Sequence, residues 1–171
     1  MTRLTGTADL PAGVAVPAYD RAAHGTGILH LGLGAFHRAH QAVYTDDALA
    51  AAGGDWRILG ANLRSRDIPD ALNAQDGLFT VLERGEVDRA RIVGAHGPAI
   101  GGDAAAILRA ACDPAIRILS LSVSEKAYGI DRAAMDIDES HPAIAADLAR
   151  PQAPQGVLGI VAAALSARRK A

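Results

Sequence analysis

Residues 27–44 set the architecture of this chain and read Gly-Ile-Leu-His-Leu-Gly-Leu-Gly-Ala-Phe-His-Arg-Ala-His-Gln-Ala-Val-Tyr. An apolar run ends in Gly32-Leu33-Gly34, and a helix-like segment follows from about Phe36. A strand, a glycine turn and a helix in this order suit the pyrophosphate of a dinucleotide. Gly32 permits the tight turn, and Gly34 lets the backbone approach the phosphates without a Cβ. The N–H groups at the helix start would then face the anion.

The glycine pattern is incomplete, because His37 stands where the usual third glycine would be. On these residues alone, an ordinary strand-to-helix turn that needs two glycines for packing is the commoner interpretation. A nucleotide site is the alternative, and the rest of the sequence has to separate the two.

Three segments carry a family resemblance. Residues 32–41 resemble the opening signature of the mannitol dehydrogenase family, the long-chain polyol dehydrogenases that include fructuronate reductase. Residues 75–81 and 122–128 match further segments in the family's order; the last resembles a Thr-Glu-Lys-Gly-Tyr element, from which Ser124 and Ala127 depart. The resemblance implies a metal-independent, NAD-dependent oxidoreductase that transfers a hydride to or from a polyol, a 2-keto sugar or a hexuronate.

We therefore expect an α/β fold with a Rossmann-like, mostly parallel sheet and flanking helices, incomplete relative to the family's full domain. Residues 1–26 read as an irregular lead-in, and residues 27–171 as the dinucleotide-binding domain. The resemblance implies that the C-terminal catalytic domain of the family is absent from this sequence.

Periodicity and turn signals place the elements. The expected strands are 27–33, 56–63, 78–83, 90–94 and 116–123. The expected helices are 38–52, 67–74, 103–112 and 140–149, with a last helix from about 157 to the basic residues at 168–170. The strands 78–83 and 90–94 could pair as a hairpin. The strand 116–123 is almost continuously apolar, as expected for burial on both faces. Asp67 and Asp103 are the expected helix caps. In the last helix, the spacing of the apolar residues predicts one buried face, formed by Val157, Val161, Ala164 and Leu165. The basic residues at its end suit the helix dipole: Arg168, Arg169 and Lys170.

Cofactor choice depends on the end of the second expected strand, which reads Asn62-Leu-Arg-Ser-Arg-Asp67. Asp55 precedes that strand and lies at its wrong end, so Asp67 is the only near acid for a ribose hydroxyl. Arg64 and Ser65 could accept a 2′-phosphate, which leaves NADP open beside NAD. Solvated loop charges are an equally good interpretation of Arg64 and Arg66. The expected cofactor-binding residues are Gly32, Gly34, Ala35, Phe36, Arg38, Asn62, Arg64, Asp67 and Ser124.

Three histidines lie close together in the sequence: His30, His37 and His40. His37 and His40 would share a helix face, but no cysteine or carboxylate completes a ligand set, so we expect no metal. We expect His37 and Arg38 near the phosphates instead, with Arg38 as the better cation.

Ser124, Glu125, Lys126 and Tyr128 follow the strand 116–123, at the edge where ligands bind in open α/β sheets. The resemblance puts this loop between the nicotinamide and the substrate, with Glu125 as a candidate for proton handling through another group. Without the resemblance, a loop of solvated charges is the better interpretation.

The family's catalytic lysine motif, Lys-x-x-x-x-Asn-x-x-His, is missing. Lys126 would need Asn at 131 and His at 134, where Asp131 and Ala134 stand. Oxidation of an alcohol needs a base for the hydroxyl proton, so we expect no catalytic residue here and no turnover by this chain alone. A polyol or keto-sugar substrate would bind only if a complementing chain supplied a catalytic domain. The alternatives are a stand-alone nucleotide-binding module and a non-functional gene remnant.

Composition excludes several other functions. The 171 residues are 50% hydrophobic and carry a formal net charge of −2, so we expect a folded domain that binds neither nucleic acid nor a membrane. No apolar run approaches the roughly 20 residues of a membrane helix. The N-terminus lacks a secretory signal, and Cys112 is the single cysteine, with a buried thiol expected. A reducing, cytoplasmic setting fits these features.

Overall fold

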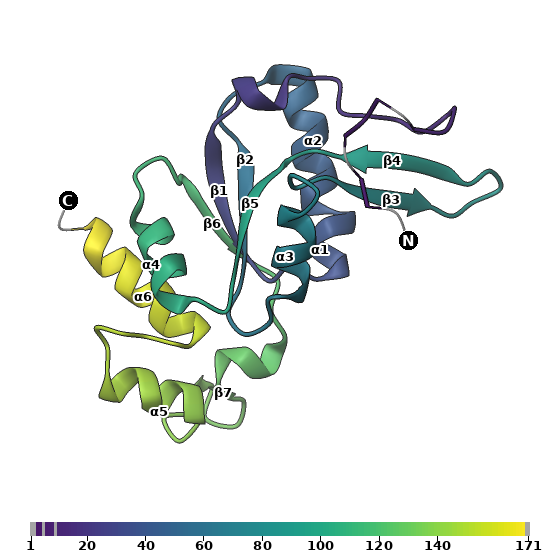
Figure 1. Cartoon of the computed structure of the whole chain (residues 1–171). Helices are drawn as coiled ribbons and strands as arrows, with labels where there is room; N and C mark the ends of the chain where they lie inside the picture. The colour runs from purple at the N-terminus through teal and green to yellow at the C-terminus, as the bar shows by residue number, and fades with distance from the viewer. Residues whose placement is uncertain (1–2, 5, 9, 170–171) are drawn as a thin grey trace.

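The computed structural model describes residues 3–4, 6–8 and 10–169. Figure 1 shows its elements, which in chain order are η1 (Arg21–Ala23), β1 (Thr26–Leu31), α1 (Ala35–Ala39), α2 (Gln41–Ala52), β2 (Arg57–Asn62), α3 (Asp67–Asn73), β3 (Phe79–Glu83), β4 (Arg89–Val93), β5 (His96–Gly101), α4 (Ala104–Cys112), β6 (Ile118–Leu121), η2 (Glu125–Tyr128), β7 (Ile130–Asp131), β8 (Asp136–Ile137), α5 (Pro142–Ala149) and α6 (Val157–Arg168). The lead-in expected over 1–26 is mostly irregular where it is described, and its positions 1, 2, 5 and 9 lie outside the described residues, as does Lys170.

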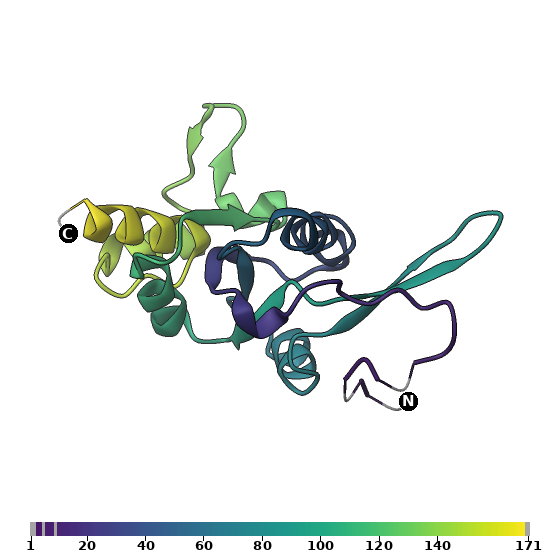
Figure 2. The same cartoon turned by 90° about the horizontal axis from the view of Figure 1, so that it is seen from above.

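A four-stranded parallel sheet in the order β5-β2-β1-β6 forms the centre of the molecule. Successive residues of β1 point to opposite faces of the sheet. Ile28 packs with α2 and α3 on one face, whereas Leu29 and Leu31 pack with α4 and α6 on the other. Figure 2 shows these helices on either side of the strands. The Rossmann-like, mostly parallel sheet with flanking helices is therefore confirmed.

The expected single helix over 38–52 is wrong in its start and its continuity. The helix begins earlier, at Ala35, and His40 separates α1 from α2 with φ −124° and ψ −82°. The imidazole Nδ1 of His40 bonds to the Phe36 carbonyl at 2.8 Å. A side chain that bonds the backbone one turn back competes with the helical ladder, which fits a break at this residue.

The two outer strands of the sheet differ most from expectation. The run 116–123 forms only the four-residue β6, and it lies at an edge rather than between two strands, with Ile118 43% exposed. At the other edge lies β5, which no local signal predicted and which contains Pro98 and two glycines. Proline is tolerated in edge strands because one side of the strand needs no ladder bonds.

The β3–β4 hairpin is confirmed as an antiparallel pair, and a buried carboxylate ties it to the domain. Asp46 of α2 is 2% exposed and accepts hydrogen bonds from Tyr19 Oη at 2.7 Å and Gly94 N at 2.8 Å. It also pairs with Arg91 of β4 at 2.9 Å. These bonds hold the lead-in, α2 and the base of the hairpin together, and the raised pKa of Tyr19, due to burial and to Asp46, fits a phenol that stays protonated.

Helix caps were predicted with mixed success. Asp103 caps α4 as expected and accepts a bond from Ala106 N at 2.8 Å. Asp67 does not cap α3, because Arg66 is the N-cap residue and Asp67 is the first helical residue. Asp67 N instead bonds to Ser65 Oγ at 3.2 Å. In α6, Leu165 was expected on the buried face but is 65% exposed, and Ile160 takes its place in the core.

The C-terminal helices are joined by a buried aspartate. Asp147 of α5 accepts hydrogen bonds from Gln155 N at 2.7 Å and from Gly156 N at 2.9 Å, at the start of α6. A Cβ on Gly159 would lie 2.2 Å from the Asp147 carboxylate, so glycine is needed for this close approach. The loop before α6 is thereby fixed against α5, and this loop forms one wall of the cleft described next.

Candidate functional site

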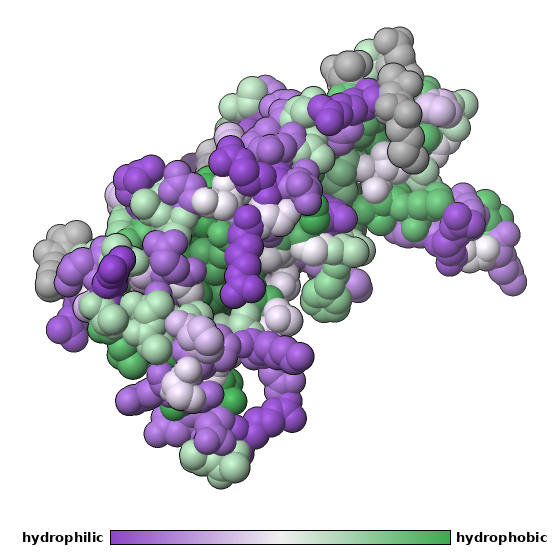
Figure 3. All heavy atoms as spheres, turned by 60° about the horizontal axis from the view of Figure 1, so that its bottom comes forward, coloured by the Kyte–Doolittle hydropathy of each residue, from purple (hydrophilic) through white to green (hydrophobic). Residues whose placement is uncertain are grey.

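A cleft of about 520 Å³ opens at the carboxyl ends of β1, β2 and β6. Four segments supply its walls: the turn after β1, the loop after β2, the segment after β6, and residues of the α5 and α6 starts. Its lining residues are Leu31, Gly32, Asn62, Leu63, Arg64, Ser65, Ser122, Val123, Ser124, Lys126, Ala127, His141, Ala143, Gln155, Gly156 and Val157. In Figure 3, which brings this side of the molecule forward, hydrophilic and hydrophobic residues are interspersed.

The glycine turn after β1 forms the floor of the cleft. Gly32 has φ +107°, and a Cβ there would lie 2.4 Å from the Ser122 carbonyl oxygen, so no other residue fits without a backbone shift. Its N–H donates to Ala61 O at 2.8 Å, and the next amide, Leu33 N–H, donates to Asn62 Oδ1 at 2.9 Å. A Cβ on Gly34 would meet nothing within 4 Å, which leaves space for a ligand to approach the backbone.

The charge of the cleft favours an anion. Arg64 and Lys126 line it, and its described lining includes no aspartate or glutamate. Side-chain hydroxyls of Ser65, Ser122 and Ser124 add hydrogen-bonding groups. A glycine turn, two cations and several hydroxyls at the carboxyl edge of a parallel sheet fit the phosphates and riboses of a dinucleotide.

The cleft brings together four of the predicted cofactor residues, Gly32, Asn62, Arg64 and Ser124. The others lie outside its lining. Gly34 and Ala35 form the start of α1, and Phe36 is 70% exposed and stacks on His40. Arg38 is half-buried, and its guanidinium donates to the Leu33 carbonyl. Asp67 is exposed at the first turn of α3.

Glu125, the candidate for proton handling, is also outside the lining of the cleft. It is the first residue of η2, is exposed, and forms an ion pair with Arg132. Its neighbours Ser124 and Lys126 do line the cleft. The role of Glu125 stays a prediction.

His37 does not lie beside the cleft, contrary to expectation. It is 1% exposed, stacks on His30 with ring centroids 3.7 Å apart, and its Nε2 lies 2.9 Å from His96 Nε2. Burial lowers the pKa of His30 to about 4, and burial lowers the pKa values of His37 and His96 to about 3. The three imidazoles are therefore neutral at pH 7, which is the form that can be buried without a counter-ion.

Sequence reasoning missed part of the cleft. Ser122 was quoted only as part of a family segment, although its position directly after a strand is a usable signal. His141 precedes Pro142, residues 155–157 follow Pro151 and Pro154, and none of them carries a local pattern for a ligand site. The hydrogen bonds of Asp147 hold Gln155 and Gly156 against α5.

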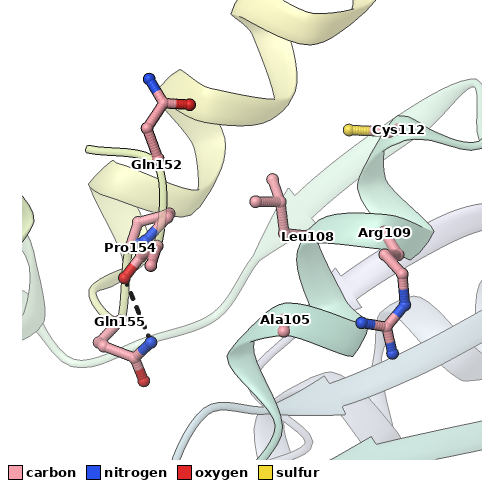
Figure 4. Close-up of a pocket in the computed structure, with 8 residues that line it drawn as sticks. Ala105, Leu108, Arg109, Cys112, Gln152, Pro154 and Gln155 are labelled. Carbon is pink, nitrogen blue, oxygen red and sulfur yellow. Dashed lines mark hydrogen bonds between the residues drawn. The ribbon is translucent and has the colours of Figure 1, made fainter. Parts of the chain in front are cut away.

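A second hollow, of about 410 Å³, lies between α4 and the loop before α6. Figure 4 shows Leu108, Arg109 and Cys112 on α4 facing Gln152 and Pro154 across it. Cys112 is half-buried rather than buried, and it is a free thiol. This hollow has no glycine turn and does not reach the carboxyl edge, so it is not the better candidate for a nucleotide.

In residues 3–4, 6–8 and 10–169, no helix is long and apolar enough to cross a membrane. Within the same residues, no group of three histidine, cysteine, aspartate or glutamate side chains is arranged to hold a metal ion.

The parallel sheet, the helices on both faces and the glycine turn at the carboxyl edge define a Rossmann-type domain. The sequence model of the mannitol dehydrogenase Rossmann domain matches residues 26–171, and the chain belongs to the mannitol dehydrogenase family.

Known proteins extend the comparison. The chain is 49% identical over 161 residues to mannitol 2-dehydrogenase of Cereibacter sphaeroides, and the aligned region covers 91% of this chain and 34% of that protein. It is 37% identical to the polyol:NADP oxidoreductase of Gluconobacter oxydans, with coverage of 95% and 35%. A solved Pseudomonas fluorescens mannitol 2-dehydrogenase, a ternary complex with NAD and D-mannitol, is 40% identical with a TM-score of 0.87, over 94% of this chain and 34% of that one. The chain thus spans about a third of the length of these relatives.

Proposed function

We propose that residues 27–171 are the cofactor-binding part of an oxidoreductase that transfers a hydride between a nicotinamide dinucleotide and a polyol, a 2-keto sugar or a hexuronate. One observation carries the proposal: the cleft at the carboxyl edge joins the Gly32 turn, the end of β2 and the segment after β6, and its lining holds cations but no carboxylate among the described residues. The family assignment and the NAD-containing solved relative support it.

Each wall of the cleft suits one part of a dinucleotide. The amides at Gly34 and Ala35 would hold the pyrophosphate. Asn62, Arg64 and Ser65, at the end of β2, would hold the adenosine ribose. Ser122, Ser124 and Lys126 would border the nicotinamide. The nicotinamide supplies the hydride chemistry when it is bound, and the protein supplies binding and orientation.

For the cofactor itself we propose NAD, which the solved relative contains. NADP is the competing candidate, because Arg64 and Ser65 line the cleft where a 2′-phosphate would lie and Asp67 does not. Fluorescence titrations with NADH and NADPH decide between them. Arg64→Ala should weaken NADPH binding about tenfold more than NADH binding if the 2′-phosphate is recognised. Equal effects on both cofactors would assign Arg64 to the pyrophosphate instead.

We also propose that the chain alone does not turn over polyols, because the lysine motif is missing from residues 1–171. The purified chain is assayed for NAD(P)-dependent oxidation of mannitol and arabinitol, and for reduction of fructuronate and tagaturonate. No rate is expected above the blank. The C-terminal two thirds of the Cereibacter sphaeroides relative, added in trans, tests whether a complementing chain restores activity. A measurable rate without it would contradict this proposal.

A stand-alone nucleotide-binding module is the second candidate function, favoured by the closed core on both faces of the sheet. It predicts NADH binding that no catalytic fragment converts into turnover. A gene remnant without a stable fold predicts neither saturable NADH binding nor a cooperative unfolding transition. Together, the titration, the unfolding curve and the complementation assay separate the three possibilities.

A further inference from the structure

An unbroken row of hydrogen bonds, buried at His96 and half-buried further along, runs from His96 on β5 to the glycine turn. His96 Nε2 lies 2.9 Å from His37 Nε2, and His37 Nδ1 lies 3.1 Å from Gln41 Oε1. Gln41 Nε2 lies 3.0 Å from Ser120 Oγ, and Ser120 Oγ lies 2.8 Å from His30 Nδ1. His30 Nε2 lies 2.8 Å from Ser122 Oγ, which lies 2.7 Å from the Gly32 carbonyl oxygen. We name these seven residues the histidine row.

The direction of the row follows from Gln41. Its Oε1 can only accept, so His37 Nδ1 carries a proton and His37 Nε2 accepts from His96. The Gln41 amide nitrogen can only donate, so Ser120 Oγ accepts from it. The Ser120 hydroxyl has two acceptors within reach, His30 Nδ1 at 2.8 Å and Gln41 Oε1 at 3.4 Å, and the shorter distance assigns its proton to the bond with His30 Nδ1. His30 then carries its proton on Nε2, and donates to Ser122 Oγ. Every bond therefore points toward Gly32.

The opposite direction would leave a buried donor without a partner. It would require a proton on His96 Nδ1, a buried atom that has no hydrogen-bond partner in the described structure. With the protons placed as above, His96 Nδ1 is an unprotonated acceptor instead. An unsatisfied buried N–H is rarer in proteins than an under-used acceptor, so the direction toward Gly32 is the stable one.

The row ends on the peptide unit that builds the turn. The Gly32 carbonyl accepts from Ser122 Oγ at 2.7 Å and faces His30 Nε2 at 3.1 Å. The other end of the same peptide unit, Leu33 N–H, donates to Asn62 Oδ1. The plane of the Gly32–Leu33 peptide is thus held from both sides, by Ser122 and His30 of β1 on one side and by Asn62 of β2 on the other.

We propose that His30 and Ser122 are positioning residues of the dinucleotide site: the histidine row fixes the Gly32–Leu33 peptide plane and thereby aims the following amides at the pyrophosphate. The inference rests on the proposed function, because the benefit of a fixed plane is cofactor binding. His96 and His37 act through the row and do not touch the cofactor.

The first experiment reads the protons directly. Long-range ¹H–¹⁵N spectra of the ligand-free chain at pH 7.5 report which ring nitrogen carries the proton in each histidine. We expect the Nδ1–H tautomer for His37 and the Nε2–H tautomer for His30 and His96. The exposed His40, together with His24 and His141, serves as a reference within the same spectrum. A Nε2–H tautomer at His37 would reverse the row and overturn the proposal.

The second experiment compares three hydroxyl deletions. Ser122→Ala removes the bond to Gly32, and Ser120→Ala interrupts the row two steps earlier, before His30. Thr45→Val removes a buried hydroxyl that bonds only to the Gln41 carbonyl. Amide exchange at Leu33 in the ligand-free chain should rise about tenfold in Ser122→Ala, about threefold in Ser120→Ala, and less than twofold in Thr45→Val. Ser122→Thr should restore the wild-type rate.

The dissociation constant for NADH should follow the same order, with about tenfold weaker binding in Ser122→Ala. Equal losses in Ser122→Ala and Thr45→Val, in proportion to their loss of stability, would overturn the positioning role. If the wild-type chain bound no NADH, the proposed function would fail, and the tautomers and the exchange at Leu33 would still decide the inference.

Discussion

Asn62 Oδ1 accepts a 2.9 Å hydrogen bond from Leu33 N–H, so the last residue of β2 holds the turn that follows β1. The Leu33 amide lies in the glycine turn, beyond the end of β1, and the side chain of Asn62 at the end of β2 accepts its hydrogen bond. The same side chain lines the cleft. Asn62 therefore links the proposed cofactor cleft to the order of the strands in the sheet.

Removing the Asn62 side-chain amide should weaken both folding and cofactor binding. Asn62→Ala leaves Leu33 N–H without its partner, and we expect a loss of about 1–2 kcal/mol in the free energy of unfolding with about tenfold weaker NADH binding. Asn73→Ala is the matched control, because Asn73 also bonds backbone groups, those of Ala99, away from the cleft. It should cost similar stability and leave NADH binding within twofold. Parallel losses of binding in both variants would contradict this prediction.

The two glycines of the turn should respond differently to alanine. Gly32→Ala places a Cβ 2.4 Å from the Ser122 carbonyl at φ +107°, so we expect a loss of several kcal/mol or no folded protein. Gly34→Ala meets nothing within 4 Å and has φ −67°, so thermal denaturation should show an almost unchanged stability. Its Cβ would nevertheless stand where the phosphates approach, and NADH titration should show at least about tenfold weaker binding. Unchanged NADH binding in Gly34→Ala would place the phosphates elsewhere.

Stability should fall as the pH is lowered from 7 to 5. Burial lowers the pKa of His30 to about 4 and those of His37 and His96 to about 3, while the unfolded chain has the usual value near 6.5. Below pH 6.5 the unfolded state therefore binds protons that the folded state does not. Each histidine then removes about 1.4 kcal/mol per pH unit from the free energy of unfolding, and above pH 7 this contribution is constant.

Urea denaturation at pH 5, 6, 7 and 8 measures this slope. Beside burial, the positive charges of Arg38 and Arg57 also lower the pKa of His96, because they disfavour a further cation nearby. His96→Gln should reduce the slope between pH 5 and 6 by about a third, since one of three titrating groups is lost. A free energy of unfolding that does not change between pH 5 and 7 would contradict the burial of neutral imidazoles.

Asp147 should matter for the wall of the cleft. Asp147→Ala leaves the amides of Gln155 and Gly156 without their acceptor, and we expect a loss of about 1–3 kcal/mol. Hydrogen exchange should rise at these two amides and NADH binding should weaken. Asp113→Ala, which removes a single exposed bond to Ala115 N, is the control and should change stability by less than about 0.5 kcal/mol. Unchanged exchange at Gln155 would show that α6 is held by its apolar face alone.

Local signals in the sequence were sufficient for elements whose residues interact with near neighbours. Asp103 was predicted as a cap because a cap bonds an amide three residues away. The β3–β4 hairpin was predicted for the same reason, since its strands follow each other in the chain. The glycine turn at Gly32 was also predicted, because a tight turn with a positive φ between a strand and a helix requires glycine.

Features that depend on distant residues were missed or misplaced. His37 was expected at the phosphates, but its partner His96 lies on a strand that carries no strand signal in the sequence. The space for this pair comes from Gly60, where a Cβ would lie 3.0 Å from the His96 ring. Burial of 116–123 was overestimated because hydrophobicity does not distinguish an edge strand from a central one. NAD specificity, the role of Glu125 and a cytoplasmic setting stay predictions.

The two outer strands of the sheet are not equivalent. Asn73 occupies both the N–H and the carbonyl of Ala99, so a side chain already takes the hydrogen bonds that a strand beside β5 would use. No described side chain does this for the backbone of Ile118–Leu121 in β6. Lateral growth of the sheet is therefore directional: a fifth parallel strand can be added beside β6, whereas beside β5 it would first have to displace an asparagine.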